Sequence, residues 1–290
     1  MIDNFLFQHY LVVFFDHLGQ RETLRKMTGI PALKTEEKSF IEHTKNSVGR
    51  VIQIREAFKD YFDAAKACEP DGLRVRTEDQ EEFLASQRKV EVSIYGISDA
   101  VVIAVPLGTS DDNCAAVNSV YDALIATCGI GLMSLSVFNI AMRAGLNVGV
   151  ATKINDNEIY GPALESAFYL ESKLAEYPRF LVGKELISYL QWVENQPCGT
   201  RIGQAAKEIA RICRALIIQD ADGRYMLDFL GAKIREVSAN IIDQDFVAAA
   251  FQFVNAQHQK YIKEENEILS SRYFRLLRYF QARKGIWGIN

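Results

Sequence analysis

Two aspartates at the ends of strand-like runs are the first residues whose positions call for a chemical explanation. Asp16 follows the apolar run Leu11–Phe15, and Asp99 separates the runs Val90–Ser98 and Ala100–Leu107. A carboxylate at the end of a buried strand is costly unless it is hydrogen-bonded, paired with a cation or bound to a metal. Two interpretations of Asp16 stay open on these grounds: a cap for the helix that follows, or a metal ligand.

The order of the predicted elements places the two aspartates together. Strand-like and helical patterns alternate as βαββαβ, which is typical of a ferredoxin-like α/β (α+β) fold. In such a sheet the end of the first strand neighbours the hairpin that carries Asp99. Two close carboxylates repel each other unless a cation lies between them. Hard oxygen ligands beside a phosphate favour Mg²⁺ or Mn²⁺, so a pair of divalent ions fits Asp16 and Asp99.

Residues suited to holding phosphate follow the first aspartate. The loop of Leu18, Gly19, Gln20 and Arg21 leads into a predicted helix, whose free N–H groups can bind an anion. Arg143, just before the predicted fourth strand, adds a planar cation that matches phosphate oxygens. Together with the aspartates, these residues indicate metal-assisted phosphoryl or nucleotidyl transfer. The structural alternative is a loop Asp, a turn Asp and a surface Arg without a joint role.

The elements that must position these residues follow from periodicity and turn signals. Apolar residues at helical spacing over about 36–66 predict one long helix or two consecutive helices. Only Ser98 and Asp99 separate two strands, which favours a tight hairpin. The other expected elements of this half are a short helix over about 19–27, a loop over 78–88, a helical stretch over 112–143 interrupted at Cys128–Gly131, and a strand at Gly145–Ile154.

A further helix and strand complete the predicted fold. After a turn at Asn155–Asn157, Gly161 and Pro162 open a helix with Pro at its favoured first position. A short strand, RFLVG, follows that helix. The residues of the helix expected to face the core are Leu164, Ala167 and Phe168.

The last hundred residues are predicted to form an extension. We expect a catalytic domain over 1–190, with a helical insertion at about 36–68, and an extension over 191–290. The extension begins with a hairpin of Ala215–Gln219 and Tyr225–Phe229, and two helical segments follow. Its basic, aromatic end carries an apolar stripe, for which packing on the body or on a dimer partner is favoured over membrane-surface binding: Tyr273, Leu276, Leu277 and Phe280.

Composition narrows the class of protein. The chain has 290 residues, of which 49% are hydrophobic, and a net charge of −4, which argues against a general binder of DNA or RNA. No apolar run approaches the roughly 18–20 residues that span a bilayer, and the N-terminus lacks a signal-peptide pattern. Five scattered cysteines without a CxxC indicate reduced core residues. We therefore expect a cytoplasmic protein without membrane insertion.

Four motifs then appear in a fixed order: FFDHLG, IYGISDAVVI, MRAGLNVG and IYGPALESAFYLES. Together they resemble the catalytic domain of the class III nucleotidyl cyclases, over about residues 9–182. The resemblance implies that Asp16 and Asp99 bind two Mn²⁺ or Mg²⁺ ions per active site, with the carbonyl of His17 as a further ligand. It also implies that Arg143 holds the triphosphate of the substrate.

The chain departs from the family at the base- and ribose-reading positions. Tyr95 stands where the purine-reading Lys is expected, and Glu158 replaces the base-reading Asp. Glu165 and Tyr169 replace the Asn and Arg that position the ribose and stabilise the transition state. A Tyr offers a hydroxyl and a stacking ring, which suits a smaller base. The alternative is that Tyr95 and Tyr169 are core aromatics and Glu165 is a surface residue.

Longer stretches resemble the pyrimidine nucleotide cyclases of Pycsar-type bacterial anti-phage systems. These are FFD-x-LG, the helices at 36–66, YGPAL-x-x-A-x-x-LES, YPRFLVGKEL and DADGRYMLDFLG. The resemblance implies a Mn²⁺-dependent enzyme that converts UTP to 3′,5′-cyclic UMP, which activates a separate effector. The alternatives are a cytidylate cyclase acting on CTP, a purine cyclase, a nucleotide-binding sensor without catalysis, and a structural protein organised by its C-terminal helices.

The resemblance further implies a homodimer with composite active sites. One protomer gives Asp16, Asp99, Arg143 and the loop 18–21. The other gives the base- and ribose-binding residues Tyr95, Glu158, Glu165 and Tyr169. The charge of the family's missing transition-state Arg has three candidate sources here: Arg50, Arg55 and Lys153.

Overall fold

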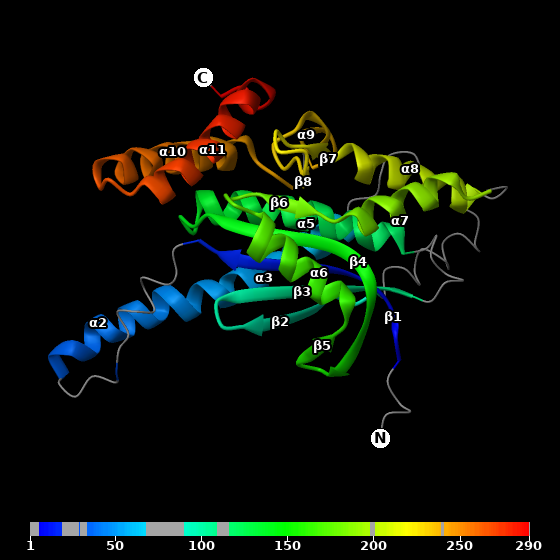
Figure 1. The fold of residues 1–290 in the computed structure, drawn as a ribbon, viewed down its shortest axis with the longest axis horizontal. Coiled ribbons are helices and arrows are strands. Elements are labelled where there is room, and N and C mark those ends of the chain that lie inside the picture. Colours follow the sequence, from blue (N-terminus) through cyan, green and yellow to red (C-terminus); the bar gives the residue numbers. More distant parts are fainter. Residues whose placement is uncertain are drawn as a thin grey trace.

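The computed structural model describes residues 6–18, 29, 34–67, 90–108, 116–197, 201–238 and 241–289. A single mixed sheet runs through the molecule, with helices on both of its faces (Figure 1). The expected short helix at 19–27, the loop at 78–88 and loop residues Gly19, Gln20 and Arg21 lie outside the described residues.

The sheet has eight strands, and its first half has the predicted ferredoxin-like order. The strands are β1 (Gln8–His17), β2 (Ser93–Ile97), β3 (Ala100–Gly108), β4 (Met142–Asn155), β5 (Glu158–Tyr160), β6 (Phe180–Val182), β7 (Ile217–Gln219) and β8 (Tyr225–Leu227). They lie in the order β2-β3-β1-β4-β6-β8-β7, and β5 pairs with β4. The pairs β2–β3, β3–β1 and β1–β4 are antiparallel, and β6 runs parallel to β4. The predicted βαββαβ fold class is confirmed.

Helices connect and cover these strands. In chain order they are α2 (Lys34–Thr44), η1 (Lys45–Gly49, a π-helix), α3 (Arg50–Ala67), α5 (Val117–Ser136), α6 (Pro162–Tyr169), η3 (Leu170–Leu174, a π-helix), α7 (Lys184–Asn195), α8 (Arg201–Ala215), α9 (Ala232–Val237), α10 (Gln244–Lys263), α11 (Glu267–Arg283) and the 3₁₀ turn η4 (Lys284–Trp287). Consecutive helices over 36–66 and a helix opening at Pro162 are thus confirmed.

Strand β1 is buried on both faces, as its uninterrupted apolar run predicts. Leu11, Val13 and Phe15 point into the larger core with α3 and α5. The alternate residues form a second, smaller core with α6: Tyr10, Val12 and Phe14. Because side chains alternate along a strand, Asp16 continues the smaller core's face and His17 continues the larger core's face.

Helix α5 is continuous, which corrects the expected interruption at Cys128–Gly131. A Cβ on Gly129 would lie 2.6 Å from the ring of Tyr61, and one on Gly131 would lie 2.3 Å from the ring of Phe180. These glycines allow close packing of α5 against its neighbours and do not end the helix. Among the described residues α5 is also the one helix long and apolar enough to cross a membrane, but 89% of its most apolar stretch is buried inside the structure.

Two further details differ from the predictions. Arg143 lies within β4, paired with Asp16 of β1, and not before the strand. Strand β4 begins three residues earlier than its apolar pattern indicates because its first residues continue the ladder with β1. Phe168 is 46% exposed, whereas Ala167 on the same helix is fully buried; the Phe168 ring packs edge-on against Phe14, with 5.2 Å between the ring centroids, at the margin of the smaller core.

The C-terminal hairpin continues the sheet beyond residue 190. Strand β8 pairs with β6, and β7 pairs with β8, which confirms the predicted hairpin. Helix α10 packs against α5 and α11 against α10. The apolar stripe of the C-terminal segment is buried in the larger core, as expected for packing on the body: Tyr273, Leu276, Leu277 and Phe280.

Candidate active site

The end of β1, the β2–β3 turn and the start of β4 meet at one end of the sheet. Asp16 pairs with Arg143 across the β1–β4 ladder. On the other side of β1, Phe15 pairs with Val101, so Asp99 in the turn lies next to the end of β1. Ser98 of this turn is left-handed, with a φ of 58°, which reverses the chain in two residues. The predicted meeting of Asp16, Asp99 and Arg143 therefore follows from strand register.

The guanidinium of Arg143 is held by three protein groups. Its Nη2 lies 2.8 Å from Oδ2 of Asp16 and 2.6 Å from Oε1 of Glu171. Its Nη1 donates to the carbonyl of Ala175 at 3.2 Å. The side chain is 16% exposed, so this cation is largely withdrawn from water. Arg143 is a fixed positive charge directly beside Asp16.

Glu171 is a site residue that sequence reasoning missed. Its side chain is 3% exposed and lies on η3. Burial raises the pKa of Glu171 to about 7; Arg143 opposes this shift, and the charges of Asp16 and Asp99 add to it. The available signal was its spacing of four residues from Ala167 and eight from Ala163, which puts a carboxylate on the helix face that packs on the sheet.

Gly145 explains how Glu171 approaches β4 so closely. A Cβ at this position would lie 2.1 Å from the carbonyl oxygen of Ala167 and 2.9 Å from the backbone nitrogen of Glu171. No L side chain fits there without moving the backbone. The glycine in the motif MRAGLNVG therefore lets α6 and η3 lie against the strand that carries Arg143.

His17 and Arg50 add two basic residues to the charges around Asp16, toward the larger core's face of the sheet. His17 is 3% exposed. Burial lowers its pKa, Asp16 and Asp99 oppose the shift, and Arg50 adds to it. Arg50, at the start of α3, is thus close enough to influence the end of β1 electrostatically. Buried His17 remains neutral at lower pH than an exposed histidine does.

Arg55 and Lys153, the other two candidates for the missing transition-state cation, lie elsewhere in the fold. The guanidinium of Arg55 covers Gly96 of β2, and its Nη2 is 1.4 Å from the point that a Cβ on Gly96 would occupy. Lys153 is exposed on the outer part of β4, where it pairs with Ile159 of β5. Of the three candidates, only Arg50 is electrostatically coupled to His17 among the described residues.

The predicted base- and ribose-binding residues do not gather at the carboxylates within one chain. Tyr95 is 5% exposed and belongs to the smaller core, and its burial raises its pKa. Glu158 on β5 and Glu165 and Tyr169 on α6 are exposed. None of the four forms a hydrogen bond or ion pair with Asp16, Asp99 or Arg143 within the described part of the chain.

The predicted phosphate loop is described only at its first residue. Leu18 is half-buried, and its amide donates to the carbonyl of Ala141 at 2.9 Å. This bond continues the β1–β4 ladder by one residue.

The donor set at this end of the sheet is chemically suited to a hard divalent cation. Asp16 and Asp99 supply carboxylate oxygens, and the His17 main chain supplies a carbonyl. The described residues contain no group of three His, Cys, Asp or Glu side chains that holds a metal by itself. A metal here would therefore complete its shell with main-chain and substrate oxygens.

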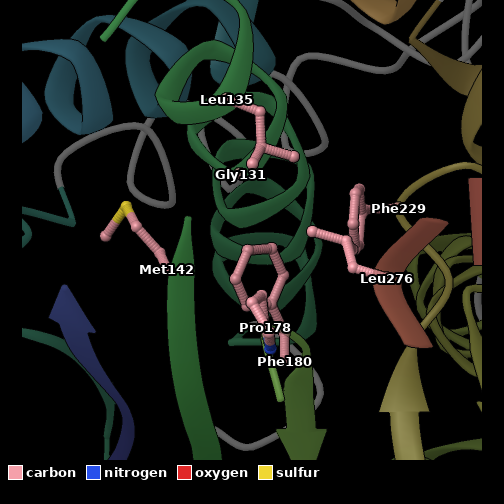
Figure 2. Close-up of a pocket in the computed structure, with 7 residues that line it drawn as sticks. All are labelled: Gly131, Leu135, Met142, Pro178, Phe180, Phe229 and Leu276. Atoms are coloured by element: carbon pink, nitrogen blue, oxygen red, sulfur yellow. The ribbon is translucent and has the colours of Figure 1, made fainter. Parts of the chain in front are cut away.

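A small apolar pocket lies between α5, the start of β4, β6 and α11 (Figure 2). Its lining contains no charged side chain, so we assign no chemistry to it. The lining residues are Gly131, Leu135, Met142, Pro178, Phe180, Phe229 and Leu276.

Comparisons with known proteins give distant likenesses only. No family model and no curated protein matches the sequence. Two solved chains, each titled as the structure of a bacterial light-regulated adenylyl cyclase, align with this one. The first has 14% identity and a TM-score of 0.33, covering 71% of this chain and 59% of that chain. The second has 13% identity and a TM-score of 0.31, covering 82% and 100%. This chain therefore spans 59% of the first structure's length.

Proposed function

We propose that this chain is a nucleotidyl cyclase that converts UTP to 3′,5′-cyclic UMP and pyrophosphate. The observation that carries the proposal is the meeting of Asp16, Asp99 and Arg143 at one end of the sheet. Two carboxylates beside a fixed cation suit phosphoryl chemistry, in which positioning and electrostatics supply most of the catalysis. The choice of a pyrimidine rests on the sequence resemblance to the Pycsar cyclases and on Tyr95 in place of a lysine.

Asp16, Asp99 and the His17 carbonyl are the groups that would hold two Mn²⁺ or Mg²⁺ ions. When bound, such ions lower the pKa of the ribose 3′-hydroxyl and offset the charge of the triphosphate. The 3′-oxygen attacks the α-phosphorus, its proton goes to solvent, and the bond to pyrophosphate breaks. Glu171 and the Ala175 carbonyl keep Arg143 beside this point, so a cation is already in place where charge gathers.

A second copy of the chain would complete the site. Glu158, Glu165 and Tyr169 are exposed and free to contact a base or ribose bound by the partner. Large exposed aromatic residues lie on the same two elements, which favours an interface there: Tyr160, Phe168 and Tyr169. Tyr95 is buried in its own chain, so its assignment requires the hydroxyl to become accessible when nucleotide binds.

The proposed role in the cell rests on the resemblance alone. We propose a cytoplasmic enzyme whose cyclic nucleotide activates a separate effector in anti-phage defence. It would act without binding DNA or RNA and without membrane insertion.

The test is incubation of the purified protein with each of the four NTPs in Mn²⁺, with products resolved by mass. We expect cyclic UMP. Cyclic CMP alone would show that the substrate is CTP and not UTP. Cyclic AMP or cyclic GMP would contradict the proposed preference for a pyrimidine base. No cyclic product from any NTP would reject the cyclase proposal, and nucleotide binding would then test the sensor alternative.

Variants connect the activity to the site. Asp99→Asn should reduce turnover by about a hundredfold or more, the scale of losing one preorganised electrostatic group. Asp63→Asn, on the exposed face of α3, is the matched control and should leave turnover unchanged. Size exclusion tests the composite site, because a monomer that turns over substrate contradicts it.

A further inference from the structure

Helix α11 of the C-terminal segment lies against the part of the chain that holds Arg143. Arg275 Nη1 on α11 lies 2.9 Å from Oε2 of Glu176, the residue after Ala175. The next residue of the helix, Leu276, shares the apolar pocket with Met142, the residue before Arg143 (Figure 2). The first half of α11 therefore passes next to the start of β4.

Arg272 is on the same side of α11 as these two contacts. It precedes Arg275 by three residues and Leu276 by four, the spacings that place helix side chains next to each other. Arg272 is half-buried, and it has no ion-pair partner among the described residues. Burial lowers the pKa of Arg272, and the nearby like charge of Arg143 lowers it further.

Helix α11 thus carries Arg272, a cation without an ion-pair partner among the described residues, past the segment that holds Arg143. Arg143 is already bound to Asp16, Glu171 and the Ala175 carbonyl. Its Nε is buried and has no hydrogen-bond partner within the described part of the chain. Within the described part of the chain, no hydrogen bond or ion pair occupies the N–H donors of Arg272. Arginine guanidinium groups match phosphate oxygens in geometry and charge, so an oligophosphate is the anion that this pair fits best.

We propose that Arg272 binds the triphosphate of the substrate and the pyrophosphate product, so that α11 forms part of the active site. This inference rests on the proposed function, because it takes the site of Asp16 and Asp99 as the place where the phosphates lie. It gives the C-terminal segment a direct part in the reaction. It also supplies a cation that none of the four recognised motifs contains.

The test measures binding of inorganic tripolyphosphate by isothermal titration calorimetry, with the same excess of Mn²⁺ in both solutions. We expect Arg272→Gln to weaken binding by about tenfold or more. Arg278→Gln, an exposed arginine on the same helix, is the matched control and should leave the affinity within about twofold. Arg272→Lys should recover part of the loss, because the charge returns without the planar geometry.

The outcomes separate the two proposals. Unchanged tripolyphosphate affinity in Arg272→Gln overturns the role of Arg272, even if the wild-type protein makes cyclic UMP. Loss of affinity in Arg272→Gln supports that role even if no NTP is cyclised, in which case only the cyclase proposal fails. A wild-type protein that does not bind tripolyphosphate overturns the Arg272 assignment. Equal thermal midpoints of wild type and Arg272→Gln exclude loss of binding through unfolding.

Discussion

Asp16 and Arg143 face each other on neighbouring antiparallel strands, and Oδ2 of the aspartate lies 2.8 Å from Nη2 of the arginine. The same nitrogen lies 2.6 Å from Oε1 of Glu171. One guanidinium thus serves two carboxylates at the end of the sheet. The more buried of the two, Glu171, depends on this cation more than Asp16 does, since less water reaches it.

The first prediction concerns this shared cation. Arg143→Met leaves Glu171 buried without a counter-charge, and we expect a loss of about 3–5 kcal/mol in the free energy of unfolding. The double variant Arg143→Met/Glu171→Gln removes the uncompensated charge as well, so it should be more stable than Arg143→Met by about 1 kcal/mol or more. Urea denaturation of both variants measures the difference. A double variant less stable than Arg143→Met would contradict a net cost of the unpaired Glu171.

The second prediction compares two glycines of β4. Gly145→Ala places a Cβ 2.1 Å from the Ala167 carbonyl oxygen, whereas Gly149→Ala places one 3.3 Å from Ala163 Cα. We expect Gly145→Ala to destabilise the protein by roughly 3 kcal/mol or more, and Gly149→Ala by about 1 kcal/mol. Thermal denaturation gives the order. Equal midpoints for the two variants would show that the close approach of α6 to Gly145 is not required.

The third prediction uses a buried carboxyl far from the site. Asp122 on α5 is 8% exposed, and burial raises its pKa to about 7, with Lys66 opposing the shift. Burial raises the pKa of the Cys213 thiol, and the charge of Asp122 adds to this rise. Because the folded pKa exceeds the unfolded value near 4, the folded state binds the proton more tightly. Stability is therefore lost as pH rises from about 4 to 7.

Asp122→Asn removes this dependence. Relative to wild type, the variant should gain up to about 4 kcal/mol between pH 4 and pH 8. Urea denaturation across this range measures the gain, and Asp63→Asn on the exposed face of α3 is the matched control. A difference between Asp122→Asn and wild type that is constant with pH would contradict the raised pKa.

The fourth prediction concerns the ion pairs that attach the C-terminal hairpin to the sheet. Arg179 is fully buried and bridges Asp220 and Asp222, with its Nη2 2.7 Å from Oδ2 of Asp222. Arg179→Met leaves Asp220 without a cation and leaves Asp222 with Arg224 alone, so a loss of about 3–5 kcal/mol is expected. Arg211→Met removes an exposed pair with Glu208 and should cost less than about 1 kcal/mol. Chemical denaturation of the two variants compares them directly.

The loss of folding stability in acid is a second measurement of the role of Arg179. Its hydrogen bond holds the pKa of Asp222 well below the usual value. A lowered folded pKa gives stability that is present above about pH 4 and is lost as pH falls through the folded pKa. Between pH 6 and pH 3 wild type should therefore lose more stability than Arg179→Met. Equal losses of stability in wild type and Arg179→Met would contradict a contribution of Asp222 to the acid sensitivity.

Much of the fold was predictable because its signals are local. The unbroken apolar run of β1 identified a doubly buried strand, and the two-residue connection at Ser98 and Asp99 identified a hairpin. Their order along the chain placed Asp16 and Asp99 at one end of a sheet. The two glycines of α5 were misleading, since they serve close packing against Tyr61 and Phe180, and sequence pattern does not distinguish packing glycines from helix-ending ones.

The amino-acid sequence by itself indicated the βαββαβ order of elements in the first half of the chain, the C-terminal hairpin and the two aspartates that we propose as metal ligands. Only the tertiary structure decided which charges meet: Arg143 with Glu171, Arg179 with Asp222, and Arg275 of α11 with Glu176. Strand and helix patterns depend on neighbours within a few residues, so they can be predicted from the sequence. The partner of a buried charge depends on strand register and helix packing between segments that are distant in sequence, and those distances exist only once the chain has folded.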